Sequence, residues 1–493
     1  MRTFFGMRKR LPWHGSQAQR MGTKRQGLGM GTTLALLAMG IAVFVVANDF
    51  TALSVALPSI EAAFGADVST VQWVINGYAL VFGVLIVTGG RLADLFGRRR
   101  IFFLGAGIFA VFSVLGGFAP GIGWLLAARA VMAVGGAMMW PAILGMTYSI
   151  LPADRAGLAG ALILGAAGFG NAAGPLIGGF LTDTFSWRWV FFLNLPVAAG
   201  AVLTTWMTVH TSETRPPGTA RSIDVPGVTV LTAGMVALLI ALDLGTDIGW
   251  GNVRILALLG FSALALVLLT VIERRAGTSA LVPADVMGKR DFLAASLTVL
   301  MMSAIFFAAL VYLPQFMQKQ LGFSAVAAGA GLLPTMGTFA VTAFATGPLY
   351  GRLGPKWTVS LGAACLAAGM FLLSRLRPES AYAAMIPGMV ILGLGVGLFY
   401  SSITTAGVTA LDPSEASLAG GIIYMFQIAG GAVGLAVNTA IVSPRPLVEG
   451  IGIAFKLDAA LAVIGLLIAV LFVGGRVDPE RLRNLRWHHR AHA

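Results

Sequence analysis

The sequence predicts an all-α membrane protein of fourteen transmembrane helices, arranged as two six-helix bundles with two inserted helices between them. Three observations predict this fold class: the composition, a series of long apolar runs and an internal repeat. Of the 493 residues, 57% are hydrophobic and 11% are charged. Such a chain has too little polar surface to cover a water-soluble globule of its size. We therefore expect it to reside in a bilayer.

Fourteen apolar runs are bounded by charged residues, Pro or Gly. Each run is long enough to cross a hydrocarbon core of roughly 30 Å as a helix. A helix is also the open-ended structure that satisfies its own backbone hydrogen bonds in lipid. The runs cover residues 32–57, 71–90, 101–119, 123–149, 157–181, 188–208, 225–243, 253–273, 292–317, 325–350, 357–375, 382–408, 416–442 and 453–475. The first run outlasts the apolar core of a cleaved signal peptide, so we expect it to stay as a span.

The distribution of basic residues predicts the orientation. An even number of spans places both termini on one side, where the tails and loops hold 25 of the 33 Lys and Arg residues. The opposite loops hold 7, and Arg129 lies within a span. By the positive-inside rule both termini are cytoplasmic. The net charge of +13 therefore reports orientation and no nucleic-acid partner is expected, because no soluble basic face gathers these residues. The preference for Arg over Lys suggests a GC-rich, bacterial genome.

An internal repeat divides the chain. The second and tenth runs end in the same spacing of Gly, Leu, Gly and a basic residue: Gly90, Leu92, Gly97 and Arg99 against Gly347, Leu349, Gly354 and Lys356. Two six-helix halves in this register are a known transporter architecture. We expect a basic cytoplasmic tail (1–31), a first half (32–208), a linker with two inserted helices (209–291), a second half (292–475) and a cytoplasmic tail (476–493).

The loop after the second run has the sequence GRLADLFGRRR, from Gly90 to Arg100. Gly90 permits a close helix approach, and Asp94 lies at a helix end where its carboxylate can face a neighbouring helix N-terminus or an Arg. The alternative is that Asp94 makes no such contact and that the basic residues of this loop only set the membrane topology.

The fifth run contains GNAAGPLIGG, from Gly170 to Gly179. Gly at every fourth position leaves one helix face without side chains, so another helix can approach it. Pro175 frees the carbonyl of Asn171 and should bend the span. The alternative is that the glycine stripe only serves ordinary close packing of helices.

Three further motifs are typical of particular spans. DFTALSVALP (49–58) closes the first run and WRWVFFLNLP (187–196) opens the sixth. In the fourth run, Arg129 is followed by a Gly-Gly-Ala sequence. This stretch is similar to the motif R-x-x-Q-G-x-G-A of the family named in the next paragraph, but it has Met132 and Ala133 in place of the Gln and the first Gly.

Over nearly the whole chain these motifs resemble the major facilitator superfamily, and within it the fourteen-span drug:proton antiporter branch, the EmrB/QacA-like exporters. The resemblance implies the major facilitator fold. It also implies a conformational latch and an antiporter motif in two residue sets: Gly90, Asp94, Gly97, Arg98 and Arg99 for the first, and Gly170, Gly174, Pro175, Gly178 and Gly179 for the second.

Asp49 and Arg129 are ionisable residues inside spans, where such groups are costly and normally paired or facing water. The first span runs outward and the fourth runs inward, so both residues reach the outer half of the membrane. Burial favours a neutral Asp49, whereas a nearby guanidinium favours the carboxylate. We predict that Asp49 binds the coupling proton and Arg129 tunes its affinity. A static pair is the alternative.

The second half supplies polar residues for a substrate cavity: Tyr312, Gln315, Tyr400, Tyr424, Gln427 and Asn438. Each can instead form an interhelical hydrogen bond. We expect no acidic residue deep in the last six spans, and hence a single carboxylate proton site. Apolar, aromatic and Met side chains would supply adaptable drug contacts.

The sequence therefore predicts proton-coupled efflux of small, largely hydrophobic drugs or antibiotics by alternating access. A dedicated exporter of one metabolite, an importer and a non-transporting sensor are the alternatives. We expect no enzyme, because the spans hold no nucleophile–base pair. We expect no nucleotide cofactor, because there is no Walker motif. We expect no metal, because the three His residues at the end of the chain have no acidic or Cys partners. The proton gradient is the expected energy source, and the chain is expected to act as a monomer in the bilayer.

Overall fold

The computed structural model describes residues 29–152, 155–209, 224–276, 280–282 and 284–473, and all of its regular structure is helical. Most of the predicted tails, 1–31 and 476–493, lies outside this range. The first six helices are α1 (Met30–Phe64), α2 (Val68–Phe96), α3 (Arg98–Gly117), α4 (Ile122–Ile150), α5 (Ala156–Thr184) and α6 (Arg188–Thr208). The following helices are α7 (Val225–Ile248), α8 (Val253–Ala276), α9 (Ala284–Gly288), α10 (Arg290–Lys319), α11 (Ala325–Gly331), α12 (Leu333–Leu373), α13 (Tyr382–Thr409), the 3-10 helix η3 (Pro413–Glu415), α14 (Ala416–Val442) and α15 (Leu447–Phe472).

Fourteen segments of the described chain can cross a membrane. Thirteen helices are long and apolar enough, and the longest of these spans 48 residues, Val326–Leu373. Gly354 interrupts it with φ of 79°, a conformation that favours glycine, so its two halves cross separately. Gly97 joins α2 to α3 with φ of 106°. The two glycines of the repeat thus make equivalent joints, and the predicted all-α membrane fold is confirmed.

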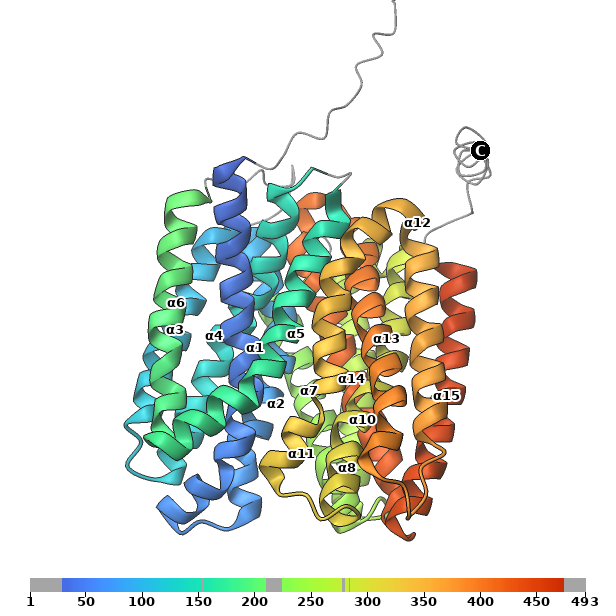
Figure 1. Cartoon of the computed structure of the whole chain (residues 1–493). Helices are drawn as coiled ribbons and strands as arrows, with labels where there is room; N and C mark the ends of the chain where they lie inside the picture. The colour runs from blue at the N-terminus through green and yellow to red at the C-terminus, as the bar shows by residue number, and fades with distance from the viewer. Residues whose placement is uncertain (1–28, 153–154, 210–223, 277–279, 283, 474–493) are drawn as a thin grey trace, which may run out of the picture.

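Each half of the bundle has its own packing. In the first half α1 contacts α5 and α6, and α4 lies between α2 and α3. In the second half α12 contacts α13 and α15, and α10 contacts α14 and α15. The halves meet mainly where α5 packs against α12 and α13, and where α2 packs against α14. Figure 1 shows the first half, blue to green, beside the second half, yellow to red.

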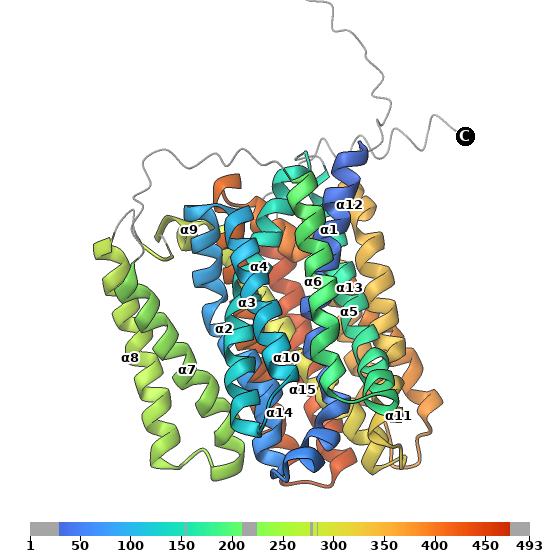
Figure 2. The same ribbon diagram turned by 90° about the vertical axis from the view of Figure 1, so that its left-hand side faces the viewer.

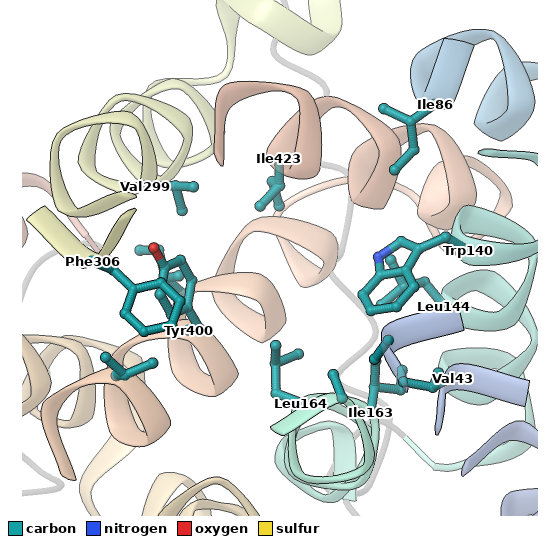
Figure 3. Close-up of a cluster of buried hydrophobic side chains, with 14 of the residues drawn as sticks. Val43, Ile86, Trp140, Leu144, Ile163, Leu164, Val299, Phe306, Tyr400 and Ile423 are labelled. Carbon is teal, nitrogen blue, oxygen red and sulfur yellow. The ribbon is translucent and has the colours of Figure 1, made fainter. Parts of the chain in front are cut away.

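Buried apolar side chains fill the interface between the halves. Trp140 and Leu144 of α4 and Leu164 of α5 belong to the same core cluster as Phe306 and Ile423 of the second half. Figure 3 shows these side chains directed from both halves toward one central region. The interior between the halves is therefore mainly apolar and aromatic.

The inserted helices α7 and α8 form a hairpin at the edge of the bundle (Figure 2). They pack on each other, and α7 also contacts α2 and α14. Glu273 of α8 is buried and accepts hydrogen bonds from the Val282 amide, while Asp224 caps α7 by accepting from the Gly227 amide. Arg91, also buried, is an electrostatic neighbour of Glu273. These charges anchor the inserted pair to the end of α2.

The helix directions define two faces of the bundle. We call the face where α1 begins and α15 ends the termini side, which is the top in Figures 1 and 2. Because successive crossings alternate in direction, α2 ends and α14 begins on the termini side, whereas α4 begins on the opposite side.

Candidate functional site

An ion pair lies buried in the first half. Asp49 is 0% exposed and Arg129 is 1% exposed, and Nη1 of Arg129 lies 2.5 Å from Oδ2 of Asp49. Asp49 lies on α1 and Arg129 lies on α4, and these two helices run in opposite directions. The expected contact between the two residues is confirmed. Their predicted roles in proton coupling stay predictions.

Asn194 of α6 completes the binding of the carboxylate. Its amide group donates to Oδ1 of Asp49 at 3.0 Å and lies 3.1 Å from the Ser113 hydroxyl. That hydroxyl donates in turn to the Phe191 carbonyl at 2.7 Å. Both carboxylate oxygens of Asp49 are therefore hydrogen-bonded. The sequence reasoning treated the WRWVFFLNLP motif as a fold marker and missed Asn194, although a polar residue within an apolar run was a signal for it.

Arg129 is held by contacts that do not depend on a neighbouring Gln. Its Nε donates to the Val74 carbonyl at 3.0 Å, and its guanidinium lies 4.1 Å from the centre of the Tyr78 ring. Met132, which stands where the usual pattern has Gln, places its sulfur 3.6 Å from Nη1. Cation–π attraction over Tyr78 and the α2 carbonyl thus replace the expected polar neighbour.

The site holds polar atoms whose hydrogen-bonding capacity is not used. Nη2 of Arg129, the Tyr78 hydroxyl and Oδ1 of Asn194 are buried without a hydrogen-bond partner in the described structure. An unpaired buried charge is strongly destabilising, so neutralising Asp49 would leave Arg129 in an unfavourable state. The stability of the buried pair therefore depends on the negative charge of Asp49.

A second polar cluster joins the halves on the termini side. Oδ2 of Asp94 accepts a hydrogen bond of 2.8 Å from the Leu418 amide, in the first turn of α14. Oδ1 of Asp94 is 3.0 Å from Nε of Arg98. A carboxylate at a helix N-terminus is stabilised by the free amides and the helix dipole there. Both partners expected for Asp94, an Arg and a helix N-terminus, are present.

Arg98 extends this cluster to two further elements. Its guanidinium donates to the Gly145 carbonyl of α4 at 3.0 Å and to the Pro413 carbonyl of η3 at 2.6 Å. The neighbouring Asp412 accepts from the Ser414 hydroxyl and amide, which hold the pKa of Asp412 below its ordinary value. Arg98 therefore connects the first half to the second, and the halves are in contact on the termini side.

The other residues of the predicted latch, Gly90, Gly97 and Arg99, have separate positions around the Asp94 and Arg98 cluster. A Cβ on Gly90 would collide with the Ser417 carbonyl of α14. Gly97 forms the joint between α2 and α3, and Arg99 donates to the Trp206 carbonyl of α6 at 2.8 Å. Gly90 thus contributes to the contact between the halves, whereas Arg99 ties α3 to α6 within the first half.

The glycines of the fifth span pack against α1. A Cβ on Gly170, Gly174 or Gly178 would meet α1 at Phe44 to Asn48, at Thr51 or at the Ala52 carbonyl respectively. Gly179 has only an ordinary contact with Val55. Pro175 lies inside the continuous helix α5, and Figure 1 shows α5 changing direction along its length. Three of the four glycines therefore bring α5 against the helix that carries Asp49.

Earlier glycines of α5 face the second half, and the sequence reasoning did not single them out. A Cβ on Gly160 would collide with Thr405 and Ser401 of α13, and one on Gly165 would collide with Phe344 of α12. Gly157 and Gly347 lie against each other in the same way. One helix thus carries two glycine faces, one toward α1 and one toward the second half.

The predicted cavity residues occupy different environments. Tyr400 is hydrogen-bonded to Ser303, Tyr312 to Thr439, and Asn438 to Gly434 and Asp458. The Tyr424 ring packs against Trp140 in a tilted arrangement and against Phe82 edge-to-face, with ring centres 4.9 and 5.7 Å away. Gln315 and Gln427 are half-buried. Tyr424 reaches the interface between the halves, whereas Tyr312, Tyr400 and Asn438 form interhelical hydrogen bonds.

A cavity of about 250 Å³ lies between α2, α7, α10 and α14. Trp73, Phe307 and aliphatic side chains form most of its lining, and Asn76, Asp243 and Thr439 supply polar groups. These residues lie toward the side opposite the termini. The cavity adjoins the inserted helix α7, which the sequence reasoning did not connect with a binding site.

Asp458 overturns one expectation. The last six spans were expected to hold no deeply placed acid, but Asp458 lies inside α15 and is 0% exposed. In the sequence, the apolar run begins at residue 453, so Asp458 lies near its start. The helix begins at Leu447, so Asp458 lies about three turns from its start. The expectation that the last six spans hold no deeply placed acid was therefore wrong.

The helices, their internal repeat and the sites described above define a multi-pass membrane transporter. The profile of the Major Facilitator Superfamily matches residues 39–435, and the chain belongs to this family. A cephamycin export protein from Amycolatopsis lactamdurans is 33% identical over 448 residues, which are 89% of this chain and 91% of that protein. A puromycin resistance protein from Streptomyces alboniger is 32% identical over 455 residues, covering 88% and 89% of the two chains. The human organic anion transporter MFSD10 has the same fold, with a TM-score of 0.65 at 14% identity over 89% of this chain and 99% of that chain.

Proposed function

We propose that this protein exports small, largely hydrophobic drugs or antibiotics across the cytoplasmic membrane in exchange for protons. The observation that carries the proposal is the buried carboxylate of Asp49, held between Arg129 and Asn194 in a transporter fold. Relatives that cover most of the chain are named for antibiotic export or resistance. The mainly apolar and aromatic interface between the halves suits hydrophobic molecules.

In this mechanism, a proton from outside neutralises Asp49 and breaks its attraction to Arg129. The unpaired guanidinium then destabilises the present packing of α1, α4 and α6. Because α1 packs on α5 through the glycine face, the change reaches the helix that also contacts the second half. Rocking of the halves would open the termini side, admit the drug and release the proton there.

The proposal includes an orientation and an energy source. By the positive-inside rule the termini side is cytoplasmic, and in the proposed mechanism the Asp94 and Arg98 cluster is the latch that closes the cytoplasmic entrance. The proton gradient supplies the energy, with no cofactor, metal or chemical reaction. The protein acts as a monomer in the bilayer and has no nucleic-acid partner.

The test is expression in a pump-deficient bacterium followed by a tolerance screen. The panel contains puromycin, lincomycin, tetracenomycin C, cephamycin and ethidium. We expect raised tolerance to several compounds, and its loss in Asp49→Asn, because this variant cannot cycle between charged and neutral forms. Asp183→Asn is the matched control, since Asp183 is an exposed acid at the end of α5. Equal amounts of each variant in the membrane must be verified by immunoblot.

Proton coupling is measured in everted vesicles that contain the wild type or Asp49→Asn. Addition of a panel compound that raises tolerance should release protons from wild-type vesicles, and the release should be lost in Asp49→Asn. Retained release in Asp49→Asn would remove Asp49 from the coupling mechanism. No tolerance shift for any compound, together with pH-independent nutrient uptake, would instead support an importer.

A dedicated exporter of one antibiotic is the second candidate. It is favoured by relatives whose names specify one compound, such as the cephamycin export protein. The same screen separates the two functions, because a dedicated exporter should shift tolerance for one chemical class alone.

A further inference from the structure

Asp458 is a buried acid for which the mechanism above has no use. One of its oxygens accepts a hydrogen bond of 3.1 Å from the Asn438 amide group on α14. The other oxygen, Oδ2, is buried without a hydrogen-bond partner in the described structure, and so is Oδ1 of Asn438. The cluster therefore contains two buried acceptor oxygens that can each accept a further hydrogen bond.

Within the described part of the chain, no positive charge is paired with this carboxyl group. Among the described residues, no Lys, Arg or His forms an ion pair with Asp458, whereas Arg129 pairs with Asp49. Lys456 and Glu449 share α15 with Asp458 but are exposed. Of the titratable groups on the helices packed against α15, Tyr312 of α10 lies within electrostatic range. An isolated carboxylate inside a membrane protein is costly, and taking up a proton removes that cost.

The Asp458 cluster adjoins a helix that contacts both the cavity and the latch. Asn438 precedes Thr439, which lines the cavity and is hydrogen-bonded to Tyr312 at 2.6 Å. The same helix, α14, begins at the latch, where the Leu418 amide binds Asp94. A movement of α14 relative to α15 would alter the Asn438 hydrogen bond, which stabilises the ionised form of Asp458. The free energy of protonating Asp458 is thus linked to the position of α14.

We propose that Asp458 is a second proton-binding site, located in the second half, whose proton affinity changes as α14 moves. The inference rests on the proposed proton coupling and extends it to two carboxyl groups of different character. The ionised form of Asp49 is stabilised by the positive charge of Arg129. The ionised form of Asp458 is stabilised by the hydrogen bond from Asn438. Such a transporter moves more protons per cycle than Asp49 alone provides.

The test is infrared spectroscopy of the purified full-length chain in liposomes, because a protonated carboxyl group has a carbonyl band that the carboxylate lacks. Spectra are recorded across a pH series for the wild type, Asp458→Asn, Asp49→Asn and Asp183→Asn. We expect a band that disappears at high pH in the wild type and is missing in Asp458→Asn. The band should persist in Asp49→Asn and in the Asp183→Asn control. Asp458→Glu retains a carboxyl group and should move the band, which separates a lost proton site from a misfolded variant.

Two further variants test the link to α14. Asn438→Leu removes the donor to the ionised form and should raise proton affinity about tenfold, which moves the midpoint to higher pH. Asp94→Asn weakens the latch and should also shift the midpoint, whereas Asp183→Asn should not. An unchanged midpoint in Asp94→Asn would overturn the link to α14.

Three results would overturn the proton site itself. The Asp458-dependent band could be absent at every pH, which means a permanently ionised group, or present up to the pH of unfolding, which means a permanently neutral one. Loss of the band on adding sodium at constant pH would identify a cation site instead. These spectra need no transported compound, so their failure is distinguishable from failure of the drug-tolerance screen.

Discussion

Single residues determine the chemistry of the buried pair. Asp49 and Arg129 were predicted from the sequence because a charge inside an apolar run needs a reason to be there. Asn194 was not predicted, since an amide is far less costly in a membrane than a charge and is common at helix contacts. Its position against Asp49, 145 residues earlier in the chain, depends on the approach of α6 to α1.

Asn194 offers a residue-scale prediction. Asn194→Leu removes a hydrogen bond to the ionised form of Asp49, so the proton should bind more tightly. A hydrogen bond to a charged group contributes about 1.5–3 kcal/mol, and about 1.4 kcal/mol corresponds to one pH unit. The pH profile of proton release in everted vesicles, driven by a panel compound that raises tolerance, should therefore move to higher pH by at least about one unit. A uniform loss of rate at every pH would contradict this role.

At the scale of the helix, the glycine faces of α5 determine how closely neighbouring helices can approach it. The glycine spacing of α5 predicted a bare face, but the sequence could not identify the partner helix. In the structure, Gly170, Gly174 and Gly178 face α1, while Gly157, Gly160 and Gly165 face the second half. The reason is that periodicity reports which residues share a helix face and carries no information about what covers that face.

Gly178 and Gly179 form a matched pair for an element-scale prediction. A Cβ on Gly178 would collide with the backbone carbonyl of Ala52, whereas one on Gly179 would make an ordinary contact. Overpacking of this kind costs about 1–3 kcal/mol. Gly178→Ala should therefore lower the melting temperature of the purified protein by several degrees, and Gly179→Ala should leave it nearly unchanged. Equal melting temperatures would show that α1 and α5 can separate at little cost.

The other glycine face of α5 has a different expected effect. Gly160→Val would place side-chain atoms against Thr405 and Ser401 of α13, so it should hinder closure of the halves on the termini side. We expect reduced drug tolerance without loss of the folded protein. The checks are the tolerance screen and a size-exclusion profile, compared with Gly200→Val, since a Cβ on Gly200 of α6 would meet no atom within 4 Å. Normal tolerance would mean that the halves close without this contact.

At the scale of the whole molecule, the two halves are in contact on the termini side. That contact includes the polar cluster of Asp94 and Arg98, a hydrogen bond of 3.0 Å between the Tyr148 and Thr405 hydroxyls, and close glycine packing. The two copies of the repeat are not equivalent chemically, because the position that corresponds to Asp94 is Gly351 and the one that corresponds to Arg98 is Pro355. The charged latch therefore belongs to one copy, and a single substitution can test it.

Accessibility of Ser417 reports on this latch. Ser417 is 0% exposed beside Gly90, so a cysteine there should react slowly with a membrane-impermeant maleimide. Asp94→Asn removes the charge that binds the α14 N-terminus and should increase labelling of Ser417→Cys several-fold, in a background in which Cys365 is replaced by Ser. The same cysteine with Asp94 intact is the control. Unchanged labelling would show that glycine packing alone keeps the halves together.

The sequence by itself determined the membrane location, the helical class, the repeat register and the positions of Asp49 and Arg129, because hydropathy, glycine spacing and buried charge are local properties of the chain. The tertiary structure alone decided that Asn194 completes the first site, that α5 has two glycine faces and that α7 borders a cavity. It also placed Asp458 in the interior, where the sequence suggested a helix end. Each of these depends on which helices approach each other, and apolar helices of similar composition do not specify their neighbours.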